Sequence, residues 1–115
     1  MSFKEKLDRA WKSSGSLVCV GLDPSPERLP PHLAKDPESI WSFNRSIIDA
    51  TAPFAAAYKP QFAHYAAVNA LHQLEQTCRY LADRYPQKLL ILDAKRGDIG
   101  STAKKYAQEA FEVYG

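Results

Sequence analysis

Apolar residues along the chain recur either three or four positions apart or in short unbroken runs. The first pattern predicts amphipathic helices, and the second predicts strands that are buried on both faces of a sheet. Together they predict helices over residues 2–13, 37–52, 68–85 and 101–114, with strands over 17–22, 54–59 and 88–95. Strands that alternate with helices of this length favour a parallel sheet whose strands are joined by right-handed crossovers.

Local signals mark the ends of several of these elements. Ser2 and Glu5 have the spacing of a capping box, and Asp36 followed by Pro37 is typical of a helix start. Residues 24–36 contain four prolines, a density that predicts an irregular loop without regular elements. The side chains predicted to form the buried stripe of the second helix are Ile40, Phe43, Ile47 and Thr51. Those predicted to share one face of the last helix are Ala103, Tyr106, Ala107, Ala110, Phe111 and Tyr114.

The predicted strands are too few for a closed structure. Three parallel strands leave both edges of a sheet open, and a complete (β/α)8 barrel needs about 250 residues. We therefore predict an α/β fold in which residues 1–115 form a single incomplete domain, the N-terminal part of a (β/α)8 barrel. The sequence ends at Gly115, directly after a predicted helix, where the turn into a fourth strand is expected.

Charge and composition exclude several classes of function. Fifteen Lys and Arg residues against thirteen Asp and Glu leave a net charge of +2, too little for a nucleic-acid or anionic-membrane binder. No apolar run approaches the roughly 20 residues of a membrane span, and the start of the chain is charged, so we expect a cytoplasmic protein. Cys19 and Cys78, without a CxxC motif or clustered His, predict neither a disulfide framework nor a zinc site.

The most informative polar residues stand at the C-terminal ends of the predicted strands, the edge where parallel α/β proteins bind ligands. The two-residue period of the third strand puts Asp93 and Lys95 on one face. The same parity places Asp23 at the end of the first strand and Lys59 at the end of the second. Carboxylates and ammonium groups that alternate in this way stay ionised when partly buried, although a solvated ion cluster is the alternative interpretation.

Asp98 follows the third strand, in a turn rich in glycine. The turn can fold this carboxylate back over the strand ends or direct it outwards to a neighbouring subunit. The sequence favours neither orientation.

Three segments of the chain resemble orotidine 5'-phosphate decarboxylases. Residues 92–103, LDAKRGDIGSTA, are similar to the signature of this family in the form found in one bacterial branch. Residues 20–24 (VGLDP) and 57–62 (AYKPQF) agree with the family in order and spacing, and the similarity extends across essentially the whole chain. Related sugar-phosphate decarboxylases and synthases also carry D-x-K-x-x-D, but without the RGDIGST continuation.

The resemblance implies a lyase that removes CO2 from orotidine 5'-phosphate to give uridine 5'-phosphate, the last step of pyrimidine nucleotide synthesis, without metal or organic cofactor. It implies that Asp23 and Lys59 hold ribose hydroxyls and that Asp93 faces the substrate carboxylate. Lys95 is expected to stabilise the carbanion at pyrimidine C6 and then to protonate it. A fixed cation suits this reaction, because negative charge develops in the ring plane when the carboxyl group leaves.

The family also implies a homodimer. In such a dimer Asp98 reaches into the partner's site, and Ile99 and Thr102 lie beside it.

The resemblance includes no phosphate-binding segment. No Gly-rich phosphate motif occurs in the 115 residues, and we expect the chain alone to bind the nucleotide poorly and to be inactive. Two alternatives remain open at this stage. The chain could be a truncated fragment without catalytic function, or it could belong to a sugar-phosphate lyase that uses Mg²⁺ at Asp93.

Overall fold

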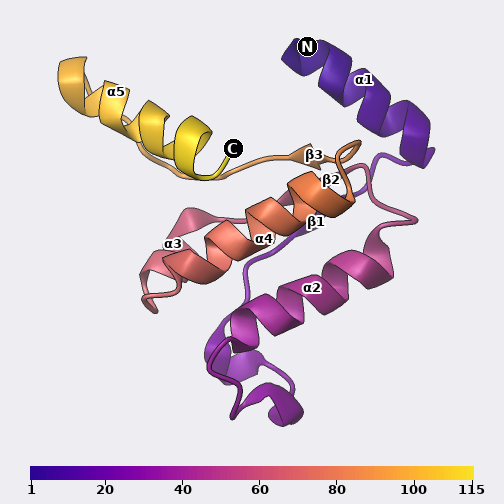
Figure 1. The fold of residues 1–115 in the computed structure, drawn as a ribbon, viewed down its shortest axis with the longest axis vertical. Helices are drawn as coiled ribbons and strands as arrows, with labels where there is room; N and C mark the ends of the chain where they lie inside the picture. The colour runs from indigo at the N-terminus through magenta and orange to yellow at the C-terminus, as the bar shows by residue number, and fades with distance from the viewer.

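A computed structural model describes residues 1–115 (Figure 1). It contains a three-stranded parallel sheet in the order β1-β2-β3, with helices between the strands as the sequence predicts. The elements are α1 (Phe3–Ser14), β1 (Cys19–Gly21), η1 (Pro26–Arg28), η2 (Pro31–Leu33), α2 (Ser39–Thr51), β2 (Ala57–Lys59), α3 (Phe62–Ala66), α4 (Leu71–Arg84), β3 (Leu89–Leu90), α5 (Gly100–Gln108) and η3 (Glu109–Val113).

The pairing register shows which residues share a face of the sheet. Cys19 pairs with Ala57, and Ala57 pairs with Leu89, so residues of odd number lie in line across the strands. Beyond the two residues of β3, the N–H groups of Ile91 and Asp93 still donate to carbonyl groups of the neighbouring segment at 2.9 and 3.0 Å. The third strand therefore continues as an extended segment to Asp93. The predicted range 88–95 is two residues too long at its end, because Lys95 adopts φ 48° and is no longer extended.

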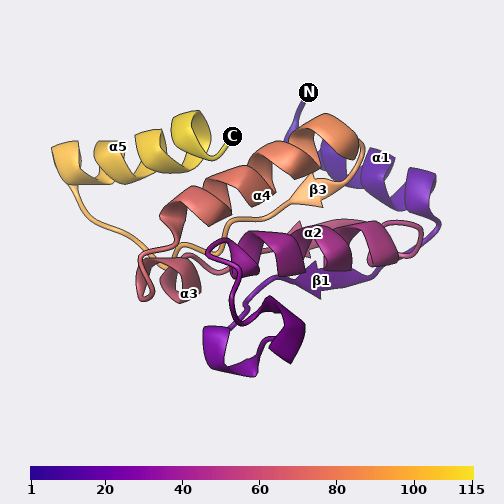
Figure 2. The same cartoon turned by 60° about the horizontal axis from the view of Figure 1, so that its bottom comes forward.

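The two faces of the sheet have different surroundings. On one face, Leu22 and Tyr58 pack with Ile48 of α2 and Leu81 of α4, and these two helices lie side by side (Figure 2). On the other face, a small cluster joins Ala57 and Leu89 to Ala10 of α1, and the rest of this face has no covering layer. We call the second face, which carries the odd-numbered residues, the open face.

The prediction that the first strand is buried on both faces is wrong. Within β1, Cys19 and Gly21 on the open face are exposed, and Val20 on the helix-covered face is half-buried. Leu17, which precedes the strand, is 77% exposed. The reason is that β1 is an edge strand of this sheet and its open face lacks a packing partner.

The proline-rich loop contains more regular structure than predicted. Two single 3₁₀ turns, η1 and η2, begin at Pro26 and Pro31, because proline suits the first position of a helical turn. Pro37 is not the first residue of the next helix, which begins at Ser39 after a turn. Asp36 supports that turn, since its Oδ1 accepts the N–H of Glu38 at 2.8 Å and its Oδ2 accepts the hydroxyl of Ser42 at 2.5 Å.

The other helices differ from the prediction in their ends and faces. The helix predicted over residues 68–85 begins only at Leu71, as α4. Asn69 adopts φ 54°, which separates α4 from the short helix α3 before it. In α2 the buried residues are Ile40, Asn44 and Ile48, while Phe43 and Ile47 are half-buried.

The last helix ends in a π-helical turn, η3, in which the N–H of Tyr114 donates to the carbonyl of Glu109 five residues earlier. This wider turn breaks the 3.6-residue period. As a result Tyr114 is 8% exposed and Phe111 is 79% exposed, although the sequence pattern predicts them on a shared face. None of the helices combines the length and the apolar character required to cross a lipid bilayer.

Candidate active site

Some of the predicted site residues gather where the three strands end, and Asp98, Ile99 and Thr102 do not. Asp23 follows β1, Lys59 is the last residue of β2, and Asp93 lies at the end of the extended segment after β3. Gly21 pairs with Lys59, and Gln61 forms a parallel bridge to Asp93, so all three charged residues lie on the open face. The parity argument from the sequence therefore identifies the correct common face.

Asp93 is the centre of a cluster of charged side chains. The Lys95 ammonium donates to both of its carboxylate oxygens, at 2.7 Å to Oδ2 and 3.0 Å to Oδ1. Lys59 Nζ lies 3.8 Å from Oδ2 of the same carboxylate. The hydrogen bond from Lys95 and the positive charges of both lysines lower the pKa of Asp93 below its ordinary value. The carboxylate is thus kept ionised, and it holds one ammonium directly and a second one nearby.

The Lys95 side chain is bound to Asp93 and is also accessible to solvent. Its side chain is 70% exposed, whereas that of Asp93 is 22% exposed. Its backbone has φ 48°, in the left-handed region that residues other than glycine rarely adopt. The ammonium is therefore accessible to a ligand on the open face while Asp93 holds it in place.

Asp23 is linked to the same cluster through the backbone. Its Oδ1 accepts the N–H of Gln61 at 2.8 Å, and Gln61 is the residue that bridges to Asp93. A Cβ at Gly21 would lie 3.7 Å from Asp23 Oδ2, an ordinary van der Waals contact. Asp23 is exposed and keeps its second oxygen free for a hydroxyl group.

The structure does not bring Asp98 to the cluster. This residue is exposed, and its Oδ1 accepts the N–H of the following residue, Ile99, at 2.7 Å. It forms no ion pair with Lys95 within this chain. Ile99 is 86% exposed, and Thr102 lies exposed in the first turn of α5. These three residues form an outward-facing group next to the lysine.

Sequence reasoning missed the residues that hold the segment between Asp93 and Asp98. The sequence pattern does not predict a role for Gln61, because its backbone N–H and not its side chain binds Asp23. Arg96 is the other missed residue, and its guanidinium lies over the ring of Phe62. No local signal reveals a contact between residues so far apart along the chain.

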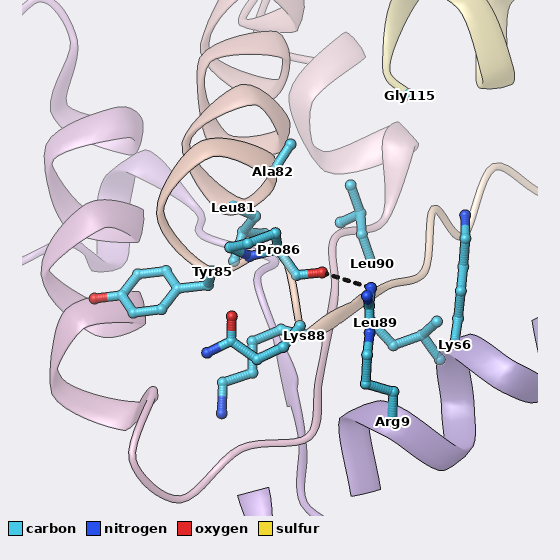
Figure 3. Close-up of a pocket in the computed structure, with 11 residues that line it drawn as sticks. Lys6, Arg9, Leu81, Ala82, Tyr85, Pro86, Lys88, Leu89, Leu90 and Gly115 are labelled. Atoms are coloured by element: carbon cyan, nitrogen blue, oxygen red, sulfur yellow. Dashed lines mark hydrogen bonds between the residues drawn. The ribbon is translucent and has the colours of Figure 1, made fainter. Parts of the chain in front are cut away.

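A separate cavity of about 280 Å³ lies at the opposite end of the sheet, between α1, the end of α4 and the start of β3 (Figure 3). Two of its cations are already engaged. Arg9 donates to the carbonyl of Pro86 at 3.1 Å, and Lys88 donates to the carbonyl of Ala55 at 2.7 Å. None of the predicted site residues lines this cavity. The charged cluster and the cavity are therefore distinct features.

The charges around Asp93 also bear on the choice of ligand. The structure contains no group of three or more His, Cys, Asp or Glu side chains arranged to hold a metal ion. Asp93 instead has two ammonium neighbours, Lys59 and Lys95. Two positive charges beside one carboxylate repel a divalent cation and favour an anionic group.

Comparisons with known proteins agree on one family. The sequence matches the orotidine 5'-phosphate decarboxylase / HUMPS family over residues 16–114. Proteins named orotidine 5'-phosphate decarboxylase from Bordetella avium and Cellvibrio japonicus are 55% and 56% identical to the chain over 114 and 117 residues. Each match covers 99% of the chain and 42% of the relative, so the chain spans less than half the length of these curated relatives.

Solved structures lead to the same fold. A crystal structure from Toxoplasma gondii that carries the name orotidine-monophosphate-decarboxylase has a TM-score of 0.83 and 39% identity, covering 96% of the chain and 37% of that structure. The orotidine 5'-monophosphate decarboxylase of Plasmodium berghei has a TM-score of 0.78 at 24% identity, with coverage of 98% and 50%, and shows likeness of fold. The three parallel strands and their helices are the N-terminal part of a (β/α)8 barrel, as predicted.

Proposed function

Since the chain belongs to the orotidine 5'-phosphate decarboxylase / HUMPS family, we propose that it forms the N-terminal part of a carboxy-lyase that converts orotidine 5'-phosphate to uridine 5'-phosphate in pyrimidine synthesis. The observation that carries this proposal is the Lys95 ammonium, hydrogen-bonded to Asp93 at the C-terminal ends of the strands and open to a ligand. Residues 1–115 then form one incomplete domain of the enzyme.

The reaction follows from the position of this ammonium. The bond between pyrimidine C6 and the carboxyl carbon breaks, CO2 leaves, and the electron pair remains on C6. The positive charge of Lys95 stabilises that carbanion, and one ammonium proton then moves to C6 and completes uridine 5'-phosphate. Lys95 regains its proton from solvent. Because the ammonium is held in place before the charge develops, it stabilises the transition state more than the ground state.

The other members of the site take supporting roles in the proposal. Asp93 lies beside the substrate carboxylate, and the repulsion between these two negative charges is relieved when CO2 leaves. Asp23 and Lys59 bind ribose hydroxyls, and Lys59 also adds positive charge next to Asp93. The reaction needs no metal or organic cofactor under this scheme.

Asp98, Ile99 and Thr102 act across a subunit boundary in the proposal. All three are exposed, and Asp98 makes no ion pair within its own chain. We propose a homodimer in which these residues complete the partner's site, in a cytoplasmic enzyme. A dimer that persists after Asp98→Ala but loses activity would support this arrangement, whereas full activity of that variant would contradict it.

The test of the function is the replacement Lys95→Ala in the protein expressed from its complete gene. We expect the rate of decarboxylation of orotidine 5'-phosphate to fall by about 10²–10⁴-fold or more, since loss of a proton-transfer group alone costs that much. The circular dichroism spectrum should stay unchanged, because the side chain is 70% exposed. Lys12→Ala on the exposed side of α1 is the matched control and should keep full activity. Near-normal turnover by Lys95→Ala would overturn the assignment.

A second measurement distinguishes the proposed decarboxylase from a Mg²⁺-dependent sugar-phosphate lyase. Its activity requires a divalent cation, so a chelator would abolish it. We expect turnover of orotidine 5'-phosphate to be unaffected by the chelator.

A further inference from the structure

Phe62 contacts the segment that carries Lys95 on both sides of that lysine. Its N–H donates to the carbonyl of Asp93 at 3.0 Å. Its ring lies under the guanidinium of Arg96, with Arg96 Cζ 4.2 Å from the ring centroid. Phe62 is itself fixed, since it is 3% exposed and its ring lies nearly perpendicular to that of Tyr114 at a centroid distance of 5.9 Å. One buried residue therefore anchors both ends of the arc formed by residues 93–96.

Arg96 is held by more than this one ring. Its guanidinium also lies 5.7 Å from the ring centroid of Tyr106 in α5, and its Nε lies 4.0 Å from Glu109 Oε1 in η3. About one third of the side chain is exposed (34%), so most of these contacts are screened from water. A planar guanidinium suits such stacking better than the point charge of a lysine ammonium. Arg96 thus ties the arc to the start of α3 and to the last helix.

These anchors explain the unusual backbone of Lys95. Ala94 packs against the core between α3 and α4, while the chain must turn so that Arg96 reaches Phe62. Lys95, between them, adopts φ 48° and directs its ammonium back to Asp93. A side chain other than glycine persists in this conformation only when its surroundings hold it there.

We propose that Arg96 is a positioning residue, which through its stacking on Phe62 holds Lys95 in the conformation that places its ammonium on Asp93. Arg96 does not touch the ligand in this scheme and acts only through Lys95. The kinetic consequence rests on the proposed decarboxylase function, whereas the structural consequence does not. The two are therefore tested separately.

The structural test measures the pKa of the Asp93 carboxyl by NMR in the protein expressed from its complete gene. Arg96→Ala should free Lys95 from Asp93, and the lowered pKa of Asp93 should rise towards its ordinary value. Arg96→Lys, which keeps a cation over the ring, should restore part of the lowering. A salt concentration of about 0.5 M screens any long-range effect of removing one charge.

The matched control is Arg79→Ala, which also removes one arginine from the surface and should leave the pKa of Asp93 unchanged. An unchanged pKa of Asp93 in folded Arg96→Ala would overturn the proposal. If Arg96→Ala does not fold, the same titration on Arg96→Lys decides, because its weaker stacking should still raise the pKa of Asp93 measurably. A pKa equal to that of the unsubstituted protein would then overturn the proposal.

The kinetic test uses the same variants. A misplaced reacting group costs up to about 10²-fold in rate, so we expect Arg96→Ala to lower kcat by 10- to 100-fold with little change in KM. Arg96→Lys should recover part of kcat. A change in KM with an unchanged kcat would contradict a role through Lys95. If the protein proves inactive on orotidine 5'-phosphate altogether, the proposed function fails, while the NMR titration still decides the role of Arg96.

Discussion

The surroundings of Cys78 give the chain a predictable response to alkaline pH. This thiol is 1% exposed in the core between α3 and α4, and burial raises its pKa from 9.0 to about 12. The unfolded chain, in contrast, releases the proton near pH 9. Above that pH the unfolded state binds fewer protons than the folded state, so the free energy of unfolding falls as the pH rises.

We therefore expect the stabilising effect of the protonated Cys78 to be complete below pH 9 and to be lost between pH 9 and about 12. Urea unfolding at several pH values measures this slope. Cys78→Ala should be less stable below pH 9 but should lack the part of the decline that begins there. The control is Cys19→Ala, which removes an exposed thiol and should keep the decline. An identical slope in Cys78→Ala and the unsubstituted protein would contradict the prediction.

Single residues also show the limits of sequence reasoning at the site. Asp93, Lys59 and Asp23 could be placed on one face because strand parity is a local property, and the register confirms it. The role of Arg96 could not be predicted in this way. That role depends on Phe62, which lies more than thirty residues before Arg96 in the sequence. Only the folded sheet brings the two side chains together.

Among the helices, the same division between local and tertiary causes is visible. The start of α1 is predicted accurately, since Ser2 and Glu5 bond each other reciprocally within a single turn. The buried stripe of α2 begins at Ile40 as predicted but then moves by one position to Asn44 and Ile48, because contacts with α3 and α4 place Asn44 inside. An apolar pattern alone favours Phe43 and Ile47 and gives no reason to bury an amide.

Asn44 links three helices through one polar network. Its Nδ2 donates to the Tyr65 hydroxyl at 2.9 Å and to Thr77 Oγ1 at 3.1 Å. The Tyr65 hydroxyl in turn donates to the carbonyl of Leu22 at 2.6 Å. The network therefore joins α2, α3 and α4 to the end of β1, directly before Asp23. Its loss would loosen the helical layer behind the site.

We expect Asn44→Ala to lower the free energy of unfolding by about 1–3 kcal/mol, the cost of leaving buried polar partners unsatisfied. Equilibrium unfolding in urea measures the change. Ser46→Ala, on the exposed side of the same helix, should change stability by less than about 0.5 kcal/mol. Equal stability of the two variants would show that the network does not join the helices.

At the scale of the whole molecule, the open face and the apolar side of α1 lack partners. Ala10 of α1 is buried against the sheet, but Phe3, Leu7 and Trp11 on neighbouring turns are 65%, 41% and 51% exposed. Cys19 is also exposed, on the face that carries the charged cluster. In a complete (β/α)8 barrel this face is the packed interior. The sequence predicts the incomplete sheet from its number of strands, but not how much apolar surface it leaves uncovered.

This arrangement predicts a difference between the 115-residue chain and a chain as long as its curated relatives, of which residues 1–115 span 42%. We expect the 115-residue chain not to decarboxylate orotidine 5'-phosphate, and its Cys19 to react rapidly with a thiol reagent. In the longer chain the remaining strands close the barrel over the open face, so decarboxylation should appear and Cys19 should become protected. Cys78 should react slowly in both, since it is buried already. Turnover by the 115-residue chain near the rate of the longer chain would contradict this account, as would an equally reactive Cys19 in both.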